Sequence, residues 1–329
     1  MLDRKRKDWI NDLISILFIM AVFFFTRTGY SSPIYADEMG YLSNAALMAG
    51  LDWSEAVKYL PYYGYGVSLL YVPLFWIFSN VDLVYIGVKV INLLSILVMY
   101  VFEKKILLCV FGEEKNVSST LTAMVCCCTP YLLAGRNFAL AEVPLATLYV
   151  LAIFFFVKYM DSKNSGYKVA LLAIGIYMLM IHLRTIGSFA VIVFMLLCCD
   201  YKEEEKKKRL KKWCFTISIA IIGVLLCFWV KGIFVSSGGA GSSSNINDIS
   251  GQGAKISYLL SRDGFLALCI SAFNKLWTFG IAYFLIPFLG IVFAIKSILK
   301  NENRMLMLFM ILAFGAEFAI NCAYISWID

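Results

Sequence analysis

Long apolar runs separated by short polar segments make up most of the sequence. A membrane-crossing helix needs about 20 apolar residues to span about 30 Å of hydrocarbon. Windows of nearly this length predict spans near residues 10–26, 83–102, 118–135, 143–158, 168–182, 186–200, 213–234, 277–297 and 305–325. The pattern therefore predicts an all-α fold, a polytopic bundle of about nine transmembrane helices.

A further apolar stretch, residues 67–78, is too short to cross the bilayer and is typical of a helix that lies along the membrane surface. If it does not cross, all the basic clusters share one side, which the positive-inside rule makes cytoplasmic. These clusters lie at residues 4–7, 104–105, 158–168, 202–212 and 296–304.

Residues 27–82 then form one large extracytoplasmic loop, with juxtamembrane helices near residues 38–49 and 66–78. We predict two parts: residues 1–234 as a transmembrane catalytic module, and residues 235–329 as a flexible outer loop, an interfacial helix near 256–276 and the last two spans. The basic N-terminus precedes an apolar run without a small-residue cleavage site, which indicates an uncleaved first span in a multi-pass protein of the cell membrane, its N-terminus cytoplasmic.

Composition narrows the class of protein. With 61% hydrophobic and 16% charged residues, the chain has the composition of a membrane protein and not of a soluble domain. The net charge of +7 belongs mainly to the loops between spans, where lysine and arginine meet anionic lipid, so nucleic acid is not an expected partner. Most of the ten cysteines lie within apolar runs, and His182 is the single histidine, so no cysteine–histidine metal site is expected.

Candidate chemistry gathers where spans end on the predicted outer side. Asp37 and Glu38 form an acidic pair shortly after the first span, and adjacent carboxylates at a membrane surface carry a desolvation cost unless they bind something. Other charged or polar groups at outer span ends are Arg136, Glu142, His182 and Arg184. Carboxylates can deprotonate a hydroxyl or hold a divalent cation, and guanidinium groups bind phosphate oxygens. Each residue alone also fits a structural role as an interfacial anchor or a helix cap.

Three strings carry a resemblance to a known family: Tyr35-Ala36-Asp37-Glu38-Met39-Gly40-Tyr41, Tyr62-Tyr63-Gly64-Tyr65-Gly66 and Leu140-Ala141-Glu142-Val143-Pro144. Over about the first 200 residues, the chain resembles the polytopic C-type (GT-C) glycosyltransferases, which include the protein O-mannosyltransferases and the aminoarabinose transferases of lipid A. The resemblance implies inverting transfer of a hexose or pentose from a polyprenyl-phosphate donor to an acceptor hydroxyl. The acceptor would be a lipid, a polymer or a protein of the cell envelope.

The resemblance also implies roles for particular residues. Asp37 matches the catalytic acid that acts as a general base, and Glu38 matches the second acid of the pair. A divalent cation held by Asp37 and Glu38 is compatible with it, and no other cofactor is implied. The remaining residues would bind substrate: Glu142, Arg184, Arg136, His182, Tyr63 and Tyr65.

Two other function classes fit the hydrophobicity. A transporter or lipid flippase would also carry ionisable residues among its spans. However, the sequence has no internal repeat and no pair of broken spans at corresponding positions, and Glu317 is the sole acid at the centre of a clean span. A scaffold without an active site would leave the acids and arginines on one face unexplained.

Overall fold

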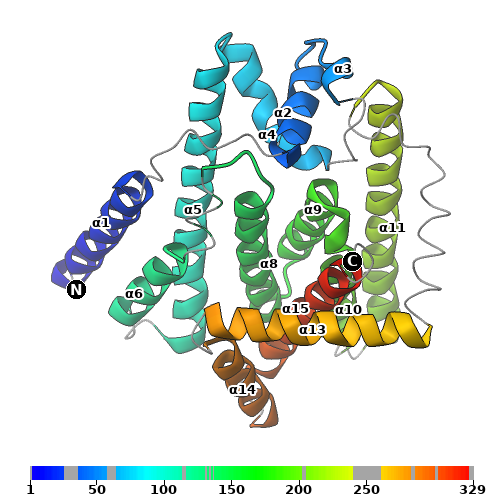
Figure 1. Ribbon diagram of the computed structural model, residues 1–329. Helices are drawn as coiled ribbons and strands as arrows, with labels where there is room; N and C mark the ends of the chain where they lie inside the picture. Colours follow the sequence, from blue (N-terminus) through cyan, green and yellow to red (C-terminus); the bar gives the residue numbers. More distant parts are fainter. Residues whose placement is uncertain are drawn as a thin grey trace. The chain divides into compact units, whose positions relative to one another are not determined.

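The computed structural model describes residues 2–25, 36–57, 64–112, 116–129, 132, 135, 137–201, 205–239, 261–282, 286–300 and 303–325. Every regular element in these ranges is a helix (Figure 1), so the all-α fold class is confirmed. Five helical segments are long and apolar enough to cross a membrane: Asp8–Phe25, Val81–Phe111, Glu142–Ser162, Leu183–Tyr201 and Lys206–Ser236. The count of nine spans stays a prediction.

The described part of the chain divides into two compact units. Unit 1 comprises Met1–His182 and Leu226–Ser242, and unit 2 comprises Leu183–Leu225 and Ser243–Asp329. Unit 1 contains α1 (Leu2–Phe25), α2 (Ala36–Met48), α3 (Ser54–Val57), α4 (Tyr65–Ile77), α5 (Val81–Phe111), α6 (Asn116–Cys127), α8 (Glu142–Ser162) and α9 (Ser165–Ile181). Unit 2 contains the 3-10 turn η2 (Leu183–Thr185), α10 (Ile186–Tyr201), α13 (Arg262–Ala282), α14 (Ile286–Leu299) and α15 (Arg304–Ile325). Helix α11 (Lys206–Ser236) is divided between the units.

Helices α2 and α4 occupy the stretches of the first loop for which the sequence predicts juxtamembrane helices. They pack against each other, and the Ser68 hydroxyl of α4 donates a hydrogen bond to the Tyr41 carbonyl of α2 at 2.9 Å. Their position along a membrane surface stays a prediction.

Two predicted spans have different helix boundaries in the structure. The described residues of the predicted span at 277–297 belong to two elements, α13 up to Ala282 and α14 from Ile286. Pro287 lies in the first turn of α14, where its missing N–H costs no helical hydrogen bond. Within the predicted span at 118–135, α6 runs from Asn116 to Cys127, and Pro130 disfavours a helical conformation at the residue before it.

Capping residues explain where the central helices begin and end. The Asn80 side chain accepts a hydrogen bond from the Asp82 N–H at 2.7 Å and caps α5, which ends at Gly112 with a positive φ of 89°. Helices α8 and α9 are joined by Lys163, in the left-handed conformation, and Asn164, which caps α9 through the Gly166 N–H. This two-residue connection makes α8 and α9 an antiparallel pair.

Helix α5 is the centre of unit 1, with α8, α6 and α1 packed against it (Figure 1). Towards the C-terminal end of α5, Lys104 forms an ion pair with Asp12 of α1 at 2.5 Å, and the Tyr100 hydroxyl donates to the same carboxylate at 2.8 Å. At the other end, Tyr85 contacts Glu38 of α2. A helix rises 1.5 Å per residue, so Tyr85 and Lys104 lie about 28 Å apart, close to the thickness of a bilayer core.

Candidate functional site

The acidic pair lies in the first turn of α2, but its two carboxylates have different environments. The Glu38 side chain is fully buried, whereas Asp37 is exposed. Consecutive residues of an α-helix point about 100° apart, so a helix with one face on the core turns one acid inward and leaves its neighbour outside. Acidic groups at a helix N-terminus are also stabilised by the helix dipole.

Glu38 connects three segments of the chain. Its Oε1 accepts a hydrogen bond from the Tyr85 hydroxyl of α5 and another from the backbone N–H of Ala139, at 2.8 Å. Hydrogen bonds to a charged group contribute about 1.5–3 kcal/mol, roughly twice the value for neutral pairs. The buried carboxylate therefore fixes the start of α2 to α5 and to the segment that precedes α8.

The segment before α8 is held by a second contact from α5. The Asn92 side-chain amide donates a hydrogen bond to the Phe138 carbonyl at 3.0 Å, and the neighbouring Ala139 and Ala141 are buried. With both contacts in place, the chain enters α8 at Glu142 close to the start of α2.

Tyr71 of α4 is a buried tyrosine whose hydroxyl is affected by both Glu38 and Glu142. Its side chain is fully buried, and its hydroxyl has no hydrogen-bond partner among the described residues. Burial raises the pKa of the Tyr71 hydroxyl above its ordinary value, and nearby ionisable groups raise it further: Tyr41, Glu38, Glu142 and Tyr85. Glu38 and Glu142 therefore lie close enough to Tyr71 to act on the same hydroxyl.

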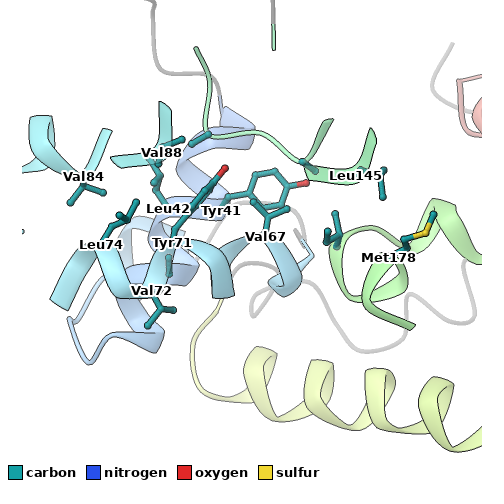
Figure 2. Close-up of a cluster of buried hydrophobic side chains, with 14 residues drawn as sticks. Tyr41, Leu42, Val67, Tyr71, Val72, Leu74, Val84, Val88, Leu145 and Met178 are labelled. Carbon is teal, nitrogen blue, oxygen red and sulfur yellow. The ribbon is translucent and has the colours of Figure 1, made fainter. Parts of the chain in front are cut away.

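A hydrophobic core surrounds Tyr71 and packs beneath the first turn of α2. Figure 2 shows side chains of α2 and α4 packed together, with residues of α5, α8 and α9 around them. Its buried members are Tyr41, Leu42, Ala45, Val67, Tyr71, Val72, Leu74, Val84, Val88, Ala139, Ala141, Leu145, Met178 and Ile181. Because five helices contribute to this core, it determines how the first turn of α2 meets the start of α8.

The two glycines of the predicted tyrosine–glycine motif let α4 lie directly on the end of α9. A Cβ atom built on Gly64 would lie 1.7 Å from the Ile181 carbonyl oxygen, and one on Gly66 would lie 2.7 Å from the Ile181 nitrogen. The Tyr177 hydroxyl of α9 donates to the Gly66 carbonyl at 2.8 Å. The motif thus places α4 beside His182, the residue that ends α9.

The other predicted site residues make different contacts, belong to different units or lie outside the described residues. The Tyr65 hydroxyl is buried and donates a hydrogen bond to the Cys227 carbonyl at 3.2 Å, so in this structure it makes a helix-to-helix contact within unit 1. Arg184 belongs to unit 2, whereas Asp37, Glu38, Tyr65, Glu142 and His182 belong to unit 1. Tyr63 and Arg136 lie outside the described residues, and their predicted roles stay predictions.

In unit 2, Arg184 lies in the turn η2 that leads into α10, and η2 packs against α15. One turn into α10, the Ser188 hydroxyl donates to Glu317 of α15 at 3.2 Å. A Cβ atom on Gly187 would lie 3.0 Å from the Ala316 Cβ, so α10 and α15 approach closely at this point. Glu317, the acid at the centre of a predicted span, therefore connects α10 and α15 just beside the turn that carries Arg184.

Within the described ranges, no three histidine, cysteine, aspartate or glutamate side chains gather in a way that would hold a metal ion. A hollow of about 320 Å³ beside α3 is lined by Asp52, Trp53, Glu55 and Ala56 and includes no predicted site residue. The Ser54 hydroxyl and backbone N–H donate to Asp52, at 2.7 and 3.2 Å, and lower the pKa of its carboxyl. This arrangement forms the start of α3.

Sequence reasoning missed three polar residues on one face of α5. Tyr85, Lys89 and Asn92 recur at helical spacing within a predicted span, and the Lys89 ammonium lies 5.8 Å from the centroid of the Tyr85 ring. A polar stripe at spacings of four and three residues in an otherwise apolar helix marks a face turned towards protein. The spacing of Tyr85, Lys89 and Asn92 was the feature of the sequence from which this face of α5 could have been predicted.

Comparison with known proteins adds no identification, because no protein-family model matches the chain and no curated protein matches it.

Proposed function

We propose that the protein is a membrane glycosyltransferase that moves a sugar from a polyprenyl-phosphate donor to an acceptor hydroxyl. The observation that carries the proposal is the division within the acidic pair. Glu38 is buried and hydrogen-bonded, while Asp37, its neighbour in the same helical turn, is exposed. A buried acid that fixes a helix start next to an exposed acid is an arrangement suited to holding a base in a defined position.

Asp37 acts as the general base in this reaction. Its carboxylate takes the proton of the acceptor hydroxyl while the acceptor oxygen forms a bond to the anomeric carbon of the sugar. The bond between that carbon and the donor phosphate breaks, and polyprenyl phosphate leaves with the bonding electrons. Because attack and departure occur on opposite faces, the transfer inverts the anomeric configuration. General-base assistance typically contributes about 10²–10⁴-fold to the rate.

Glu38 is a positioning residue in this account. Its hydrogen bonds to Tyr85 and Ala139 orient the first turn of α2, on which Asp37 stands. Glu142 starts α8 beside the same buried group and borders the acceptor side. The proposed roles of Glu38 and Glu142 both depend on the core around Tyr71. Substitutions that alter the packing of this core should therefore affect them, as should substitutions that remove a charge.

Cations are needed around the donor phosphate. Arg184 is the proposed phosphate ligand, because a guanidinium group offers paired donors to phosphate oxygens. Lys89 adds a positive charge on the face of α5 that also carries Tyr85, the partner of Glu38. His182 and Arg136 complete the proposed substrate-binding set, with Tyr63 and Tyr65 from the start of the α4 region.

The proposed site faces the extracytoplasmic side. The Asp12–Lys104 pair and the basic ends of α5 and α8 would be cytoplasmic under the positive-inside rule. Tyr85 lies about one bilayer thickness away along α5, so Glu38 and Asp37 fall at the opposite surface. This orientation suits a multi-pass enzyme of cell-envelope glycan, glycolipid or glycoprotein synthesis.

Native mass spectrometry of the purified protein tests the proposal through its donor. A co-purifying polyprenyl phosphate, together with transfer or hydrolysis of one member of a panel of polyprenyl-phosphate sugars, is the expected result. Absence of both across the panel would overturn the enzyme assignment. Net movement of a labelled lipid or solute across proteoliposomes, without donor turnover, would identify a transporter or flippase instead.

A further inference from the structure

Two lysines from neighbouring helices gather around one aromatic ring at the C-terminal ends of α5 and α8. The Lys105 ammonium nitrogen lies 5.0 Å from the ring centroid of Phe102 and 6.0 Å from that of Phe154. The Lys158 ammonium lies 5.8 Å from the Phe154 centroid and 3.6 Å from the Cys109 sulfur of α5. The two helices therefore present a pair of positive charges at one place.

Carboxylates on the same helices do not neutralise this pair. Glu103 is close to Lys105 in sequence, but its Oε2 accepts a hydrogen bond from the Cys127 thiol of α6 at 3.7 Å. Among the described residues, neither Lys105 nor Lys158 forms an ion pair, and Asp161, one turn beyond Lys158, is exposed. Both ammonium groups lie within 6.0 Å of the Phe154 ring centroid, so the two positive charges at this place are complementary to an anion.

The surroundings of the lysine pair are aromatic. The Phe102 and Phe154 rings meet edge to face with centroids 4.8 Å apart, and Phe155 continues the row at 5.4 Å from Phe154. Ammonium groups beside a partly exposed aromatic ring, Phe102, suit a molecule that joins a phosphate to hydrocarbon. A free phosphate ion would make no use of the rings.

We propose that Lys105 and Lys158 bind the phosphate of an anionic phospholipid, whose glycerol and acyl region packs on the half-buried Phe102 ring, which the buried Phe154 supports. A lysine near an anionic membrane surface is worth enough binding free energy to make the association measurable. This lipid site lies at the opposite end of α5 from Tyr85 and Glu38. It is independent of the proposed sugar transfer.

Titration of the purified full chain in detergent, followed by native mass spectrometry, tests the lipid site. The probes are dioleoyl phosphatidylglycerol, dioleoyl phosphatidylcholine and inorganic phosphate. The wild type should retain the anionic lipid in preference to the other two. Lys105→Gln and Lys158→Gln should each weaken it about fivefold, and the double variant about 25-fold. Lys207→Gln, at an exposed position in the first turn of α11, serves as the matched control.

Three results would overturn the proposal. These are equal retention of the two lipids, unchanged affinity in both single variants, or a loss in Lys207→Gln as large as in Lys105→Gln. Binding of inorganic phosphate as strong as binding of the anionic lipid would show an ion site without a lipid. Lys105→Arg and Lys158→Arg keep the charge and should retain the lipid, and the single variants decide the result if the double variant does not fold.

Discussion

The Tyr85 hydroxyl of α5 donates a hydrogen bond to the buried Glu38 carboxylate of α2, which ties α2 to a helix long and apolar enough to cross a membrane. The same Glu38 oxygen accepts the Ala139 N–H, so three segments far apart in sequence meet at one atom. The position of Asp37, one residue earlier, depends on this junction. Substitutions of Glu38 or Tyr85, which form the contact, should therefore affect stability differently from substitutions of the exposed Asp37.

Glu38→Gln and Tyr85→Phe should lower the thermal stability of the detergent-solubilised protein. Each removes a buried charge-assisted hydrogen bond, which costs about 1–3 kcal/mol. Because both act on one contact, the double variant should lose less than the sum of the two, with a coupling of about 0.5–3 kcal/mol. Asp37→Asn, on the exposed neighbour, is the control and should leave stability unchanged. Strict additivity would show that the contact contributes nothing.

Gly64→Ala and Gly66→Ala should destabilise the protein by about 1–3 kcal/mol, because the new methyl group would overlap backbone atoms of Ile181. Gly232→Ala is the matched control within α11, where an added Cβ has no atom within 4 Å. Alanine there should be neutral or stabilising by up to about 1 kcal/mol. Thermal unfolding of the three variants separates the cases, and equal effects at all three sites would refute the close approach of α4 to α9.

Membrane orientation can be read by cysteine labelling in a background without native cysteines. Single cysteines at the exposed positions Asp161 and Lys207 should react from the cytoplasmic side, and one at Glu55 of α3 from the opposite side. Cell-surface reagents that do not cross membranes make the measurement direct. Labelling of Glu55 and Asp161 positions from the same side would exclude the topology, and with it the extracytoplasmic site.

Arg184→Ala should weaken binding of the polyprenyl-phosphate donor more than binding of the acceptor. Loss of a charge-assisted partner from a buried phosphate costs on the order of 2–5 kcal/mol by comparison with interface charge pairs. Lysine should restore part of the affinity, because it carries the charge without the planar fork. Unchanged donor affinity in Arg184→Ala would assign the phosphate to another cation, with Lys89 and Arg136 as the next to test.

Hydrophobic periodicity predicted the helical class and the two helices of the first loop, because both depend on local apolar patterns. The placement of Glu38 and Glu142 at span ends on one side of the membrane stays a prediction. The inward turn of Glu38 and the outward turn of Asp37 were not predicted, since only the packing of α2 on α4 and α5 decides which face of α2 is buried. The boundaries of α13 and α14 within residues 277–297 were also not predicted, because average hydropathy over a window gives no helix boundaries.

Transfer of sugar from a polyprenyl-phosphate donor by wild type, Asp37→Asn and Glu38→Gln tests whether Asp37 is the catalytic base. Asparagine keeps the shape of Asp37 and caps a helix about as well, but it cannot accept a proton. We expect a loss of about 10²–10⁴-fold in Asp37→Asn with unchanged membrane expression and thermal stability, whereas Glu38→Gln should lose stability together with activity. Full transfer activity in Asp37→Asn would contradict the assignment of Asp37 as the base.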